Sequence, residues 1–166
     1  MDSSGKEYTV VFEKIMDKYG DMVYRICLTI TGNTEDARDS FQETFLRLVK
    51  NQDKIKNEEH LKAWLIRVAT NCSRTIAASP WNRKTQGIKD TDADHGEYLL
   101  QSSGLLSELQ RLPDKYSVVL YLFYYEEYSI KEIGQLLNKK ENSVKTLLNR
   151  GRKLLQKRLE EGGDRL

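Results

Sequence analysis

Apolar side chains recur every three or four residues along almost the whole chain, and this spacing is what most limits the fold. It is the spacing of one face of an α-helix. The sequence has no β-rich runs, and its only prolines are Pro80 and Pro113. Because proline breaks the interior of a helix, its scarcity agrees with long helices. We therefore expect an all-α protein.

Residues 1–79 are predicted to form a first domain of three helices. The first covers about residues 6–31 and ends at Gly32-Asn33, because glycine and asparagine tolerate the left-handed C-cap. Asn33 or Thr34 then caps a second helix, whose expected apolar face is Ala37, Phe41, Phe45, Leu48 and Val49. After a polar stretch, the third helix runs from near Glu58 to about Ser79, since the next residue is proline.

A linker and a second helical domain are predicted for the rest of the chain. Residues 80–97 are rich in Asn, Asp, Thr and Gly and have few apolar groups, which is typical of a flexible linker. Residues 98–166 form the second domain. Its helices are expected over about residues 99–112, 113–125, 129–137 and 143–161. The expected inward side chains of the last helix are Val144, Leu147, Leu148, Leu154, Leu155 and Leu159.

Charge alternates along the chain although the total is close to zero. The 27 basic and 25 acidic side chains give a formal charge of +2. Residues 1–60 and 91–137 carry net charges of −3 and −5, whereas residues 61–90 and 138–166 each carry +5. Two basic blocks of this kind indicate anionic partners such as nucleic acid.

The second basic block has the pattern of a helix-turn-helix. Ser129 and Glu132 form an S-x-x-E capping box at the start of a short helix, and a polar turn leads into a longer basic helix. A helix of this kind can enter the major groove of DNA. The side chains left for base edges and phosphates are Lys145, Thr146, Asn149, Arg150, Arg152 and Lys153. The alternative is an ordinary solvated basic face, but the coincidence of capping box, turn and basic helix favours DNA binding.

An aromatic run at residues 121–125 has two possible roles. Exposed aromatic rings can stack on bases. Because the run lies within an amphipathic helix before the helix-turn-helix, we favour core packing.

Four sequence motifs resemble one known family, the extracytoplasmic-function (ECF) class of bacterial RNA polymerase sigma factors. They are D-A-R-D-S-F-Q-E-T-F-L-R-L at residues 36–48, L-K-A-W-L-I-R-V-A-T-N at 61–71, L-P at 112–113 with Y-S-I-K-E-I at 128–133, and S-V-K-T at 143–146. The resemblance covers about residues 8–160 with the motifs in the family's order. It implies two helical domains, region 2 and region 4, joined by the linker.

The resemblance also implies the partners. Region 2 would bind the clamp helices of the polymerase β′ subunit and open the −10 promoter element on its non-template strand. Region 4 would bind the β flap and read the −35 element as a duplex. An anti-sigma factor, often membrane-anchored, would hold the protein inactive until a stress signal arrives.

Site residues follow from the matching motif positions. The polymerase contact would be made by Asp39, Gln42, Glu43 and Arg47, whose spacing puts them on one helical face that could otherwise be merely solvated. The −10 contacts would be Ile55, Lys56, Arg67, Asn71 and Arg74, with Ile55 and Asn71 near a flipped base and the arginines, together with Arg83 and Lys84, on phosphates. In region 4, Lys145, Thr146 and Arg150 would read bases, while Arg152 and Lys153 would contact phosphates.

Two other functions are alternatives to this one. A stand-alone helix-turn-helix regulator would use the N-terminal half to sense a ligand or to dimerise. An enzyme has no support, because the sequence has no Gly-rich phosphate loop, no nucleophile elbow and no cluster of metal ligands. We therefore expect no cofactor, no metal and no small-molecule substrate. Two isolated cysteines and a polar N-terminus without an apolar core favour a reduced, cytoplasmic setting.

Overall fold

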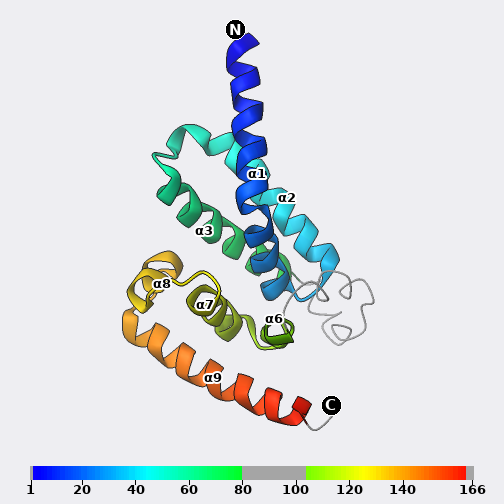
Figure 1. Cartoon of the computed structure of the whole chain (residues 1–166), viewed down its shortest axis with the longest axis vertical. Coiled ribbons are helices and arrows are strands. Elements are labelled where there is room, and N and C mark those ends of the chain that lie inside the picture. Colours follow the sequence, from blue (N-terminus) through cyan, green and yellow to red (C-terminus); the bar gives the residue numbers. More distant parts are fainter. Residues whose placement is uncertain (1, 80–103, 164–166) are drawn as a thin grey trace.

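The computed structural model describes residues 2–79 and 104–163, with side chains described for residues 12–79 and 104–161. Every element of regular structure in these two ranges is a helix, which confirms the expected all-α class (Figure 1). The predicted linker at residues 80–97, with Arg83 and Lys84, lies outside the described residues, as does the predicted helix start near residue 99.

Three helices form an N-terminal bundle: α1 (Asp2–Thr31), α2 (Thr34–Asn51) and α3 (Glu58–Ala77). Gly32, with a φ of 75°, makes the turn after α1. The Asn33 side chain then caps α2 by accepting a hydrogen bond from the backbone N–H of Asp36 at 2.8 Å. Asn57 caps α3 in the same way through the N–H of His60 at 2.7 Å. Both caps satisfy backbone donors that a helix start leaves unpaired.

The core of this bundle lies between all three helices, which pack against one another. Ile26 of α1, Leu48 of α2 and Leu65 of α3 are all fully buried. Burying such a side chain contributes roughly 1.5–3 kcal/mol. Phe41 and Phe45 of α2 add an aromatic contact with a centroid distance of 4.8 Å. Val49, predicted to be inward, is instead 45% exposed, because it lies at the edge of the apolar face on which Leu48 is fully buried.

Four helices form a C-terminal bundle: α6 (Gly104–Leu109), α7 (Asp114–Tyr124), α8 (Ile130–Leu137) and α9 (Glu141–Gly163). Both halves of the predicted capping box form at the start of α8. Asn138 ends α8 in the left-handed conformation, with a φ of 55°. The turn is shorter than predicted, since α9 begins at Glu141 and not at residue 143. The backbone N–H of Val144 already bonds to the Lys140 carbonyl at 3.1 Å, which places residues 141–143 within the first helical turn.

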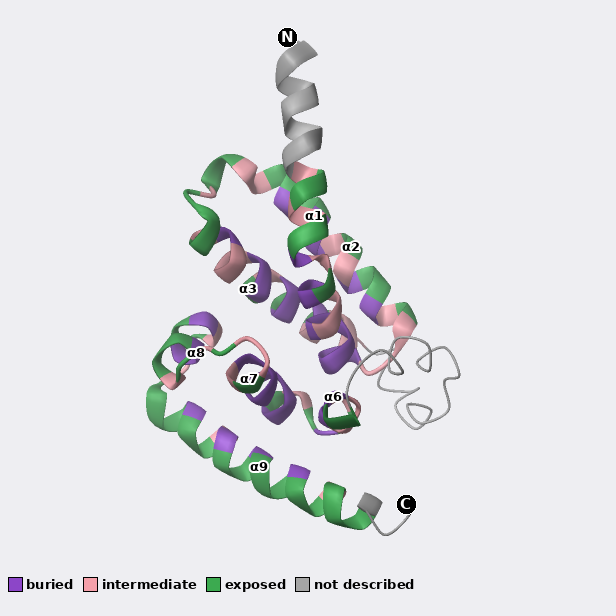
Figure 2. Cartoon of the chain, viewed as in Figure 1, coloured by how far each residue is buried: buried purple, intermediate pink, exposed green. Residues whose placement is uncertain are grey.

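Close approach of α9 to α7 depends on Gly151. A Cβ at this position would lie 2.9 Å from Cδ1 of Leu120. Val144, Leu148 and Leu155 are buried on the same side of α9, which faces α7 (Figure 2). Two predictions of inward leucines are wrong: Leu154, which lies beside this stripe, is 38% exposed, and Leu159, which continues the stripe one turn beyond Leu155, is 45% exposed.

The two bundles pack directly on each other. α1 packs against α7, and α3 packs against α8. Buried apolar side chains of both bundles belong to one continuous cluster, which includes Ile26 of α1 and Tyr121 of α7. α3 and α7 accordingly carry many of the buried positions seen in Figure 2.

Candidate nucleic-acid and protein interfaces

The outer face of α2 carries the four residues predicted to bind a protein partner. Asp39 and Gln42 are exposed, and the Arg47 Nε donates to Oε1 of Glu43 at 3.0 Å. Both side chains of this ion pair remain about half exposed, at 50% and 46%. The structure therefore brings all four onto one helix and leaves them accessible.

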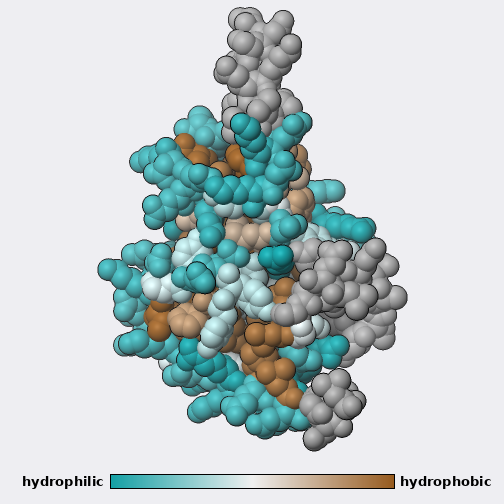
Figure 3. Space-filling view, viewed as in Figure 1, coloured by the Kyte–Doolittle hydropathy of each residue, from teal (hydrophilic) through white to brown (hydrophobic). Residues whose placement is uncertain are grey.

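Two apolar residues that sequence reasoning did not assign to this site extend the α2 face. Leu46 is 56% exposed and Val49 is 45% exposed. They follow Asp39 by seven and ten residues, a spacing that continues the row of Asp39 and Gln42. Most of the surface in Figure 3 is hydrophilic, with apolar side chains gathered in a few patches. Exposed apolar residues beside accessible charges are typical of a protein-binding surface.

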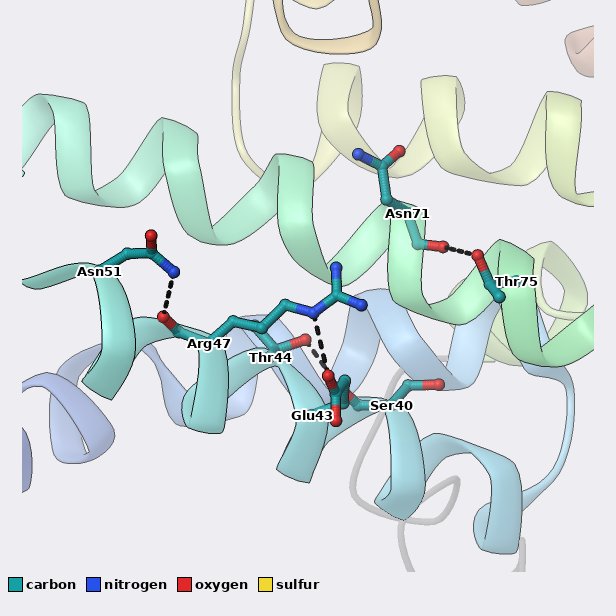
Figure 4. A network of polar contacts seen from close by, with 7 residues as sticks. All are labelled: Ser40, Glu43, Thr44, Arg47, Asn51, Asn71 and Thr75. Carbon is teal, nitrogen blue, oxygen red and sulfur yellow. Dashed lines mark hydrogen bonds and ion pairs between the residues drawn. The ribbon is translucent and has the colours of Figure 1, made fainter. Parts of the chain in front are cut away.

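Near this face, side-chain hydrogen bonds form within α2 and within α3 (Figure 4). The Asn51 amide donates to the Arg47 carbonyl at 2.8 Å, and the Thr75 hydroxyl donates to the Asn71 carbonyl at 2.9 Å. The side chain of Arg47 reaches toward α3. Burial raises the pKa of Cys72 on α3, and the nearby Arg47 charge acts in the opposite direction.

Local hydrogen bonds hold the conformation of the segment between α2 and α3. It begins with a short 3₁₀ helix, η1 (Gln52–Lys54), and the N–H of Ile55 bonds to the Gln52 carbonyl at 3.1 Å. Ile55 is partly buried against the apolar core, while Lys56 is exposed and donates its backbone N–H to Nδ1 of His60 at 3.1 Å. Ile55 therefore offers only part of its side chain to a ligand.

The three predicted nucleic-acid contacts of α3 lie on one face of that helix. Arg67, Asn71 and Arg74 are spaced by four and three residues. Asn71 is exposed, and its amide points away from α2 (Figure 4). The two arginines instead contact the C-terminal bundle: Arg67 donates to the Leu136 carbonyl at 3.4 Å, and Arg74 pairs with Asp114 at 3.5 Å. Sequence reasoning did not anticipate these partners.

On α9, the predicted base and phosphate contacts form two adjacent rows outside the buried stripe. The rows are Lys145, Asn149 and Arg152, and Thr146, Arg150 and Lys153, and all six residues are exposed. The Thr146 hydroxyl donates to the Asn142 carbonyl at 3.0 Å, which fixes its rotamer. The structure thus presents a continuous basic face of the size of a recognition helix.

Aromatic side chains of α7 contact Arg152, one of these basic residues. Arg152 donates to the Tyr124 hydroxyl at 2.6 Å and lies 5.4 Å from the centroid of the Phe123 ring. It also donates to Oδ1 of Asn149 at 3.4 Å. Tyr124 is 49% exposed, so the prediction of core packing for the aromatic run is wrong at this position. It holds for Tyr121 and Leu122, which are fully buried.

Three further features bear on the kind of site the chain can hold. Among the described residues, no group of three His, Cys, Asp or Glu side chains is arranged to hold a metal ion. None of the helices described is long and apolar enough to cross a membrane. Cys27 and Cys72 are free and buried.

Comparison with protein families defines the class of this protein. The family model described as sigma-70 region 2 matches residues 15–77, and the model described as sigma-70 region 4 matches residues 103–155. These matches correspond to the N-terminal and C-terminal bundles. The chain therefore has both regions of a sigma-70-type protein.

Individual relatives narrow the class. The chain is 32% identical to the ECF RNA polymerase sigma factor SigW of Bacillus subtilis, over 90% of this chain and 89% of SigW. It is 30% identical to SigM of the same organism, over 89% of this chain and 94% of SigM. The sigma factor RpoE of Bartonella quintana, solved with the anti-sigma factor NepR, has the same fold, with a TM-score of 0.63, 15% identity and coverage of 90% and 96%. The chain belongs to the ECF RNA polymerase sigma factor family.

Proposed function

We propose that this chain binds core RNA polymerase and directs it to specific promoters, where it takes part in melting the DNA and starting transcription. The observation that carries this function is the presence of two family regions on one chain, each with its own accessible surface. A regulator that only binds duplex DNA has no need for the exposed face of α2, which would bind the polymerase.

The division of labour follows the two bundles. Region 2, within residues 1–79, would bind the polymerase through Asp39, Gln42, Glu43 and Arg47 of α2. The exposed charges and the adjacent Leu46 support this assignment. Region 4, within residues 98–166, would read the −35 duplex, with residues 80–97 as the link between them.

Reading of the −35 element would use the two rows on α9. Lys145, Thr146 and Arg150 would meet base edges in the major groove, since lysine and arginine pair with guanine and threonine accepts or donates. Asn149 has its oxygen engaged by Arg152, so its NH₂ group remains to donate to an acceptor on a base. Arg152 and Lys153 would contact phosphates, which position the helix without reading sequence.

Opening of the −10 element would use the α2–α3 segment. Unstacking a base costs a few kcal/mol, so the protein must hold the extruded base to keep the strands apart. The exposed amide of Asn71 and the partly exposed Ile55 would line that pocket, while Lys56, Arg67 and Arg74 would bind the neighbouring phosphates.

Further properties follow from the same assignment. The protein would have no catalytic chemistry of its own, would use no cofactor and would act in the cytoplasm, where the polymerase is. An anti-sigma factor would be its inhibitor. RpoE of Bartonella quintana was solved bound to such a factor, which supports this expectation.

Run-off transcription with purified core polymerase tests the proposal. Added protein should direct initiation from a subset of promoters on fragments of the genome, and polymerase alone should not. If the protein binds duplex DNA but never directs initiation, it is a stand-alone regulator and the proposal fails.

A further inference from the structure

Arg152 of α9 links the aromatic end of α7 to Asn149, one of the predicted base contacts. We propose that this link sets which base Asn149 reads: with its amide oxygen engaged by Arg152, Asn149 selects guanine and not adenine. The inference rests on the proposed function of region 4, because it needs α9 to lie in the major groove of the −35 element.

Side chains of α7 fix the position of the Arg152 guanidinium. Its Nε donates to the Tyr124 hydroxyl at 2.6 Å. Its central carbon lies 5.4 Å from the ring centroid of Phe123 and 5.6 Å from that of Tyr124. The face of an aromatic ring attracts a cation at such distances. One hydrogen bond and two rings therefore restrict a long side chain that, without partners, would sample many rotamers.

The guanidinium in turn orients the Asn149 amide. Nη1 of Arg152 donates to Oδ1 of Asn149 at 3.4 Å. The two residues are three positions apart on α9, so their side chains are neighbours on the helix surface. A guanidinium has donors and no acceptor, so the amide beside it presents its oxygen and turns its NH₂ group away. The remaining nitrogen, Nη2, can still meet a phosphate, which agrees with the phosphate role proposed for Arg152.

An amide oriented in this way distinguishes the two purines. On its major-groove edge adenine presents the N7 acceptor and the N6 amino donor, whereas guanine presents two acceptors, N7 and O6. An asparagine with a free oxygen pairs with both groups of adenine. Here Arg152 brings a positive charge to the Asn149 oxygen, where the adenine amino group would have to bind. The NH₂ group is left to donate, and guanine is the purine that offers it only acceptors.

Selection from a randomised duplex library measures the base preference. The full-length protein is used bound to core polymerase, and the selection is repeated with the protein alone. Asn149→Ala should flatten the preference at one position, which identifies the base pair that Asn149 reads. At that position the wild type should prefer G·C to A·T by about 2- to 10-fold, the range expected for one hydrogen bond. A wild-type preference for A·T there, or no position that responds to Asn149→Ala, overturns the inference.

Arg152→Ala tests the link itself. Without the guanidinium the Asn149 oxygen is free to accept from adenine, so the preference at this position should shift toward A·T. The matched control is Lys153→Ala, which removes the same charge from the next residue of α9, also exposed. It should weaken binding to all duplexes alike and keep the preference for G·C. An unchanged preference in Arg152→Ala, or an equal shift in Lys153→Ala, contradicts the orienting role of Arg152.

Tyr124→Phe extends the test to α7. The variant keeps the ring and removes the hydroxyl that accepts from Arg152. The preference should shift in the same direction as in Arg152→Ala, but by less. Because Tyr124, Asn149, Arg152 and Lys153 are all exposed, the circular dichroism spectrum should stay that of the wild type in every variant. A wild-type preference in Tyr124→Phe would show that α7 has no part in base selection.

Failure of the inference is distinguishable from failure of the proposed function. A protein that directs initiation but reads A·T through Asn149 keeps the proposed function and loses the inference. A protein that selects G·C through Asn149 when alone, and never directs initiation, does the reverse.

Discussion

At the scale of single residues, Gly134 and Gly151 are the positions of the C-terminal bundle where an added side chain would meet close neighbours. Gly134 is the tighter position, because an added Cβ would lie 2.7 Å from the backbone carbonyl oxygen of Lys139. The N–H of Lys139 bonds to the Gly134 carbonyl at 2.8 Å, so this backbone has little freedom to move away. The helix-turn-helix turn therefore requires glycine here.

Gly134→Ala should lower the free energy of unfolding by about 1–3 kcal/mol, the usual cost of forcing extra volume into a packed site. Urea denaturation followed by circular dichroism measures it. Gly104→Ala is the control, since nothing lies within 4 Å of an added Cβ there and alanine favours the helix. Equal stability of Gly134→Ala and the wild type would contradict the crowding of this turn.

Tyr124 is the second residue whose role can be isolated. Tyr124→Phe removes the acceptor for Arg152 and keeps the aromatic ring. Arg152 is then less firmly placed for a phosphate, so we expect −35 duplex affinity to fall several-fold. The lost surface hydrogen bond lowers the free energy of unfolding by no more than about 0.5–1.5 kcal/mol. Fluorescence anisotropy with the duplex measures the affinity. Unchanged affinity would mean that Tyr124 does not position Arg152.

The buried thiol of Cys27 makes stability depend on alkaline pH. Burial raises its pKa from 9.0 to about 12. The unfolded chain then loses its proton at lower pH than the folded protein, so stability is full below about pH 9 and falls as pH rises toward 12. Urea denaturation at pH 8 and pH 10 should show this fall, and Cys27→Ser should show less of it. A Cys27→Ser variant with the same pH dependence as the wild type would assign the effect to other groups.

At the scale of the helices, α2 and α9 each divide into a buried stripe and an exposed face with separate roles. In α9 the stripe through Gly151 packs on α7, and the basic rows lie outside this stripe, where their side chains are exposed. In α2 the inward side is apolar, whereas the outward side carries Asp39 and Gln42. Because the functional side chains avoid the stripes, charge reversal on these faces should change binding without unfolding the protein.

Asp39→Lys/Glu43→Lys applies this reasoning to α2. We expect loss of binding to core polymerase of at least tenfold, with an unchanged helical circular dichroism spectrum. Glu13→Lys/Asp17→Lys is the matched control, since it reverses two exposed charges with the same spacing on α1. Binding is measured by surface plasmon resonance with immobilised polymerase. Equal loss in both variants would point to general electrostatics and not to this face of α2.

At the scale of the whole molecule, one apolar cluster spans both bundles. Elements that share a core unfold together in small proteins. We therefore expect a single unfolding transition for the described helices. Trp64 fluorescence in a Trp81→Phe variant reports on the N-terminal bundle, and circular dichroism reports on all helices. Two separated midpoints for these probes would show that the bundles unfold independently.

Most of the fold and the surface positions of the site residues could be predicted from sequence, because they depend on local patterns. Helical spacing predicted the all-α class, and the cap residues Asn33 and Ser129 marked helix starts that the structure confirms. The predictions that failed at Val49 and Leu154 concern residues at the edge of an apolar face. Whether an edge position is covered depends on the neighbouring helix and not on the residue itself.

The sequence by itself determined the helices, the turn chemistry and the alternation of charge, since each arises from residues close together in the chain. The four motifs it carries also indicated the family. Only the tertiary structure decided that Arg67 and Arg74 face Leu136 and Asp114. These contacts join residues at least 40 positions apart. Their formation depends on how two separately patterned bundles bury a shared apolar surface, and no local pattern encodes that relative placement.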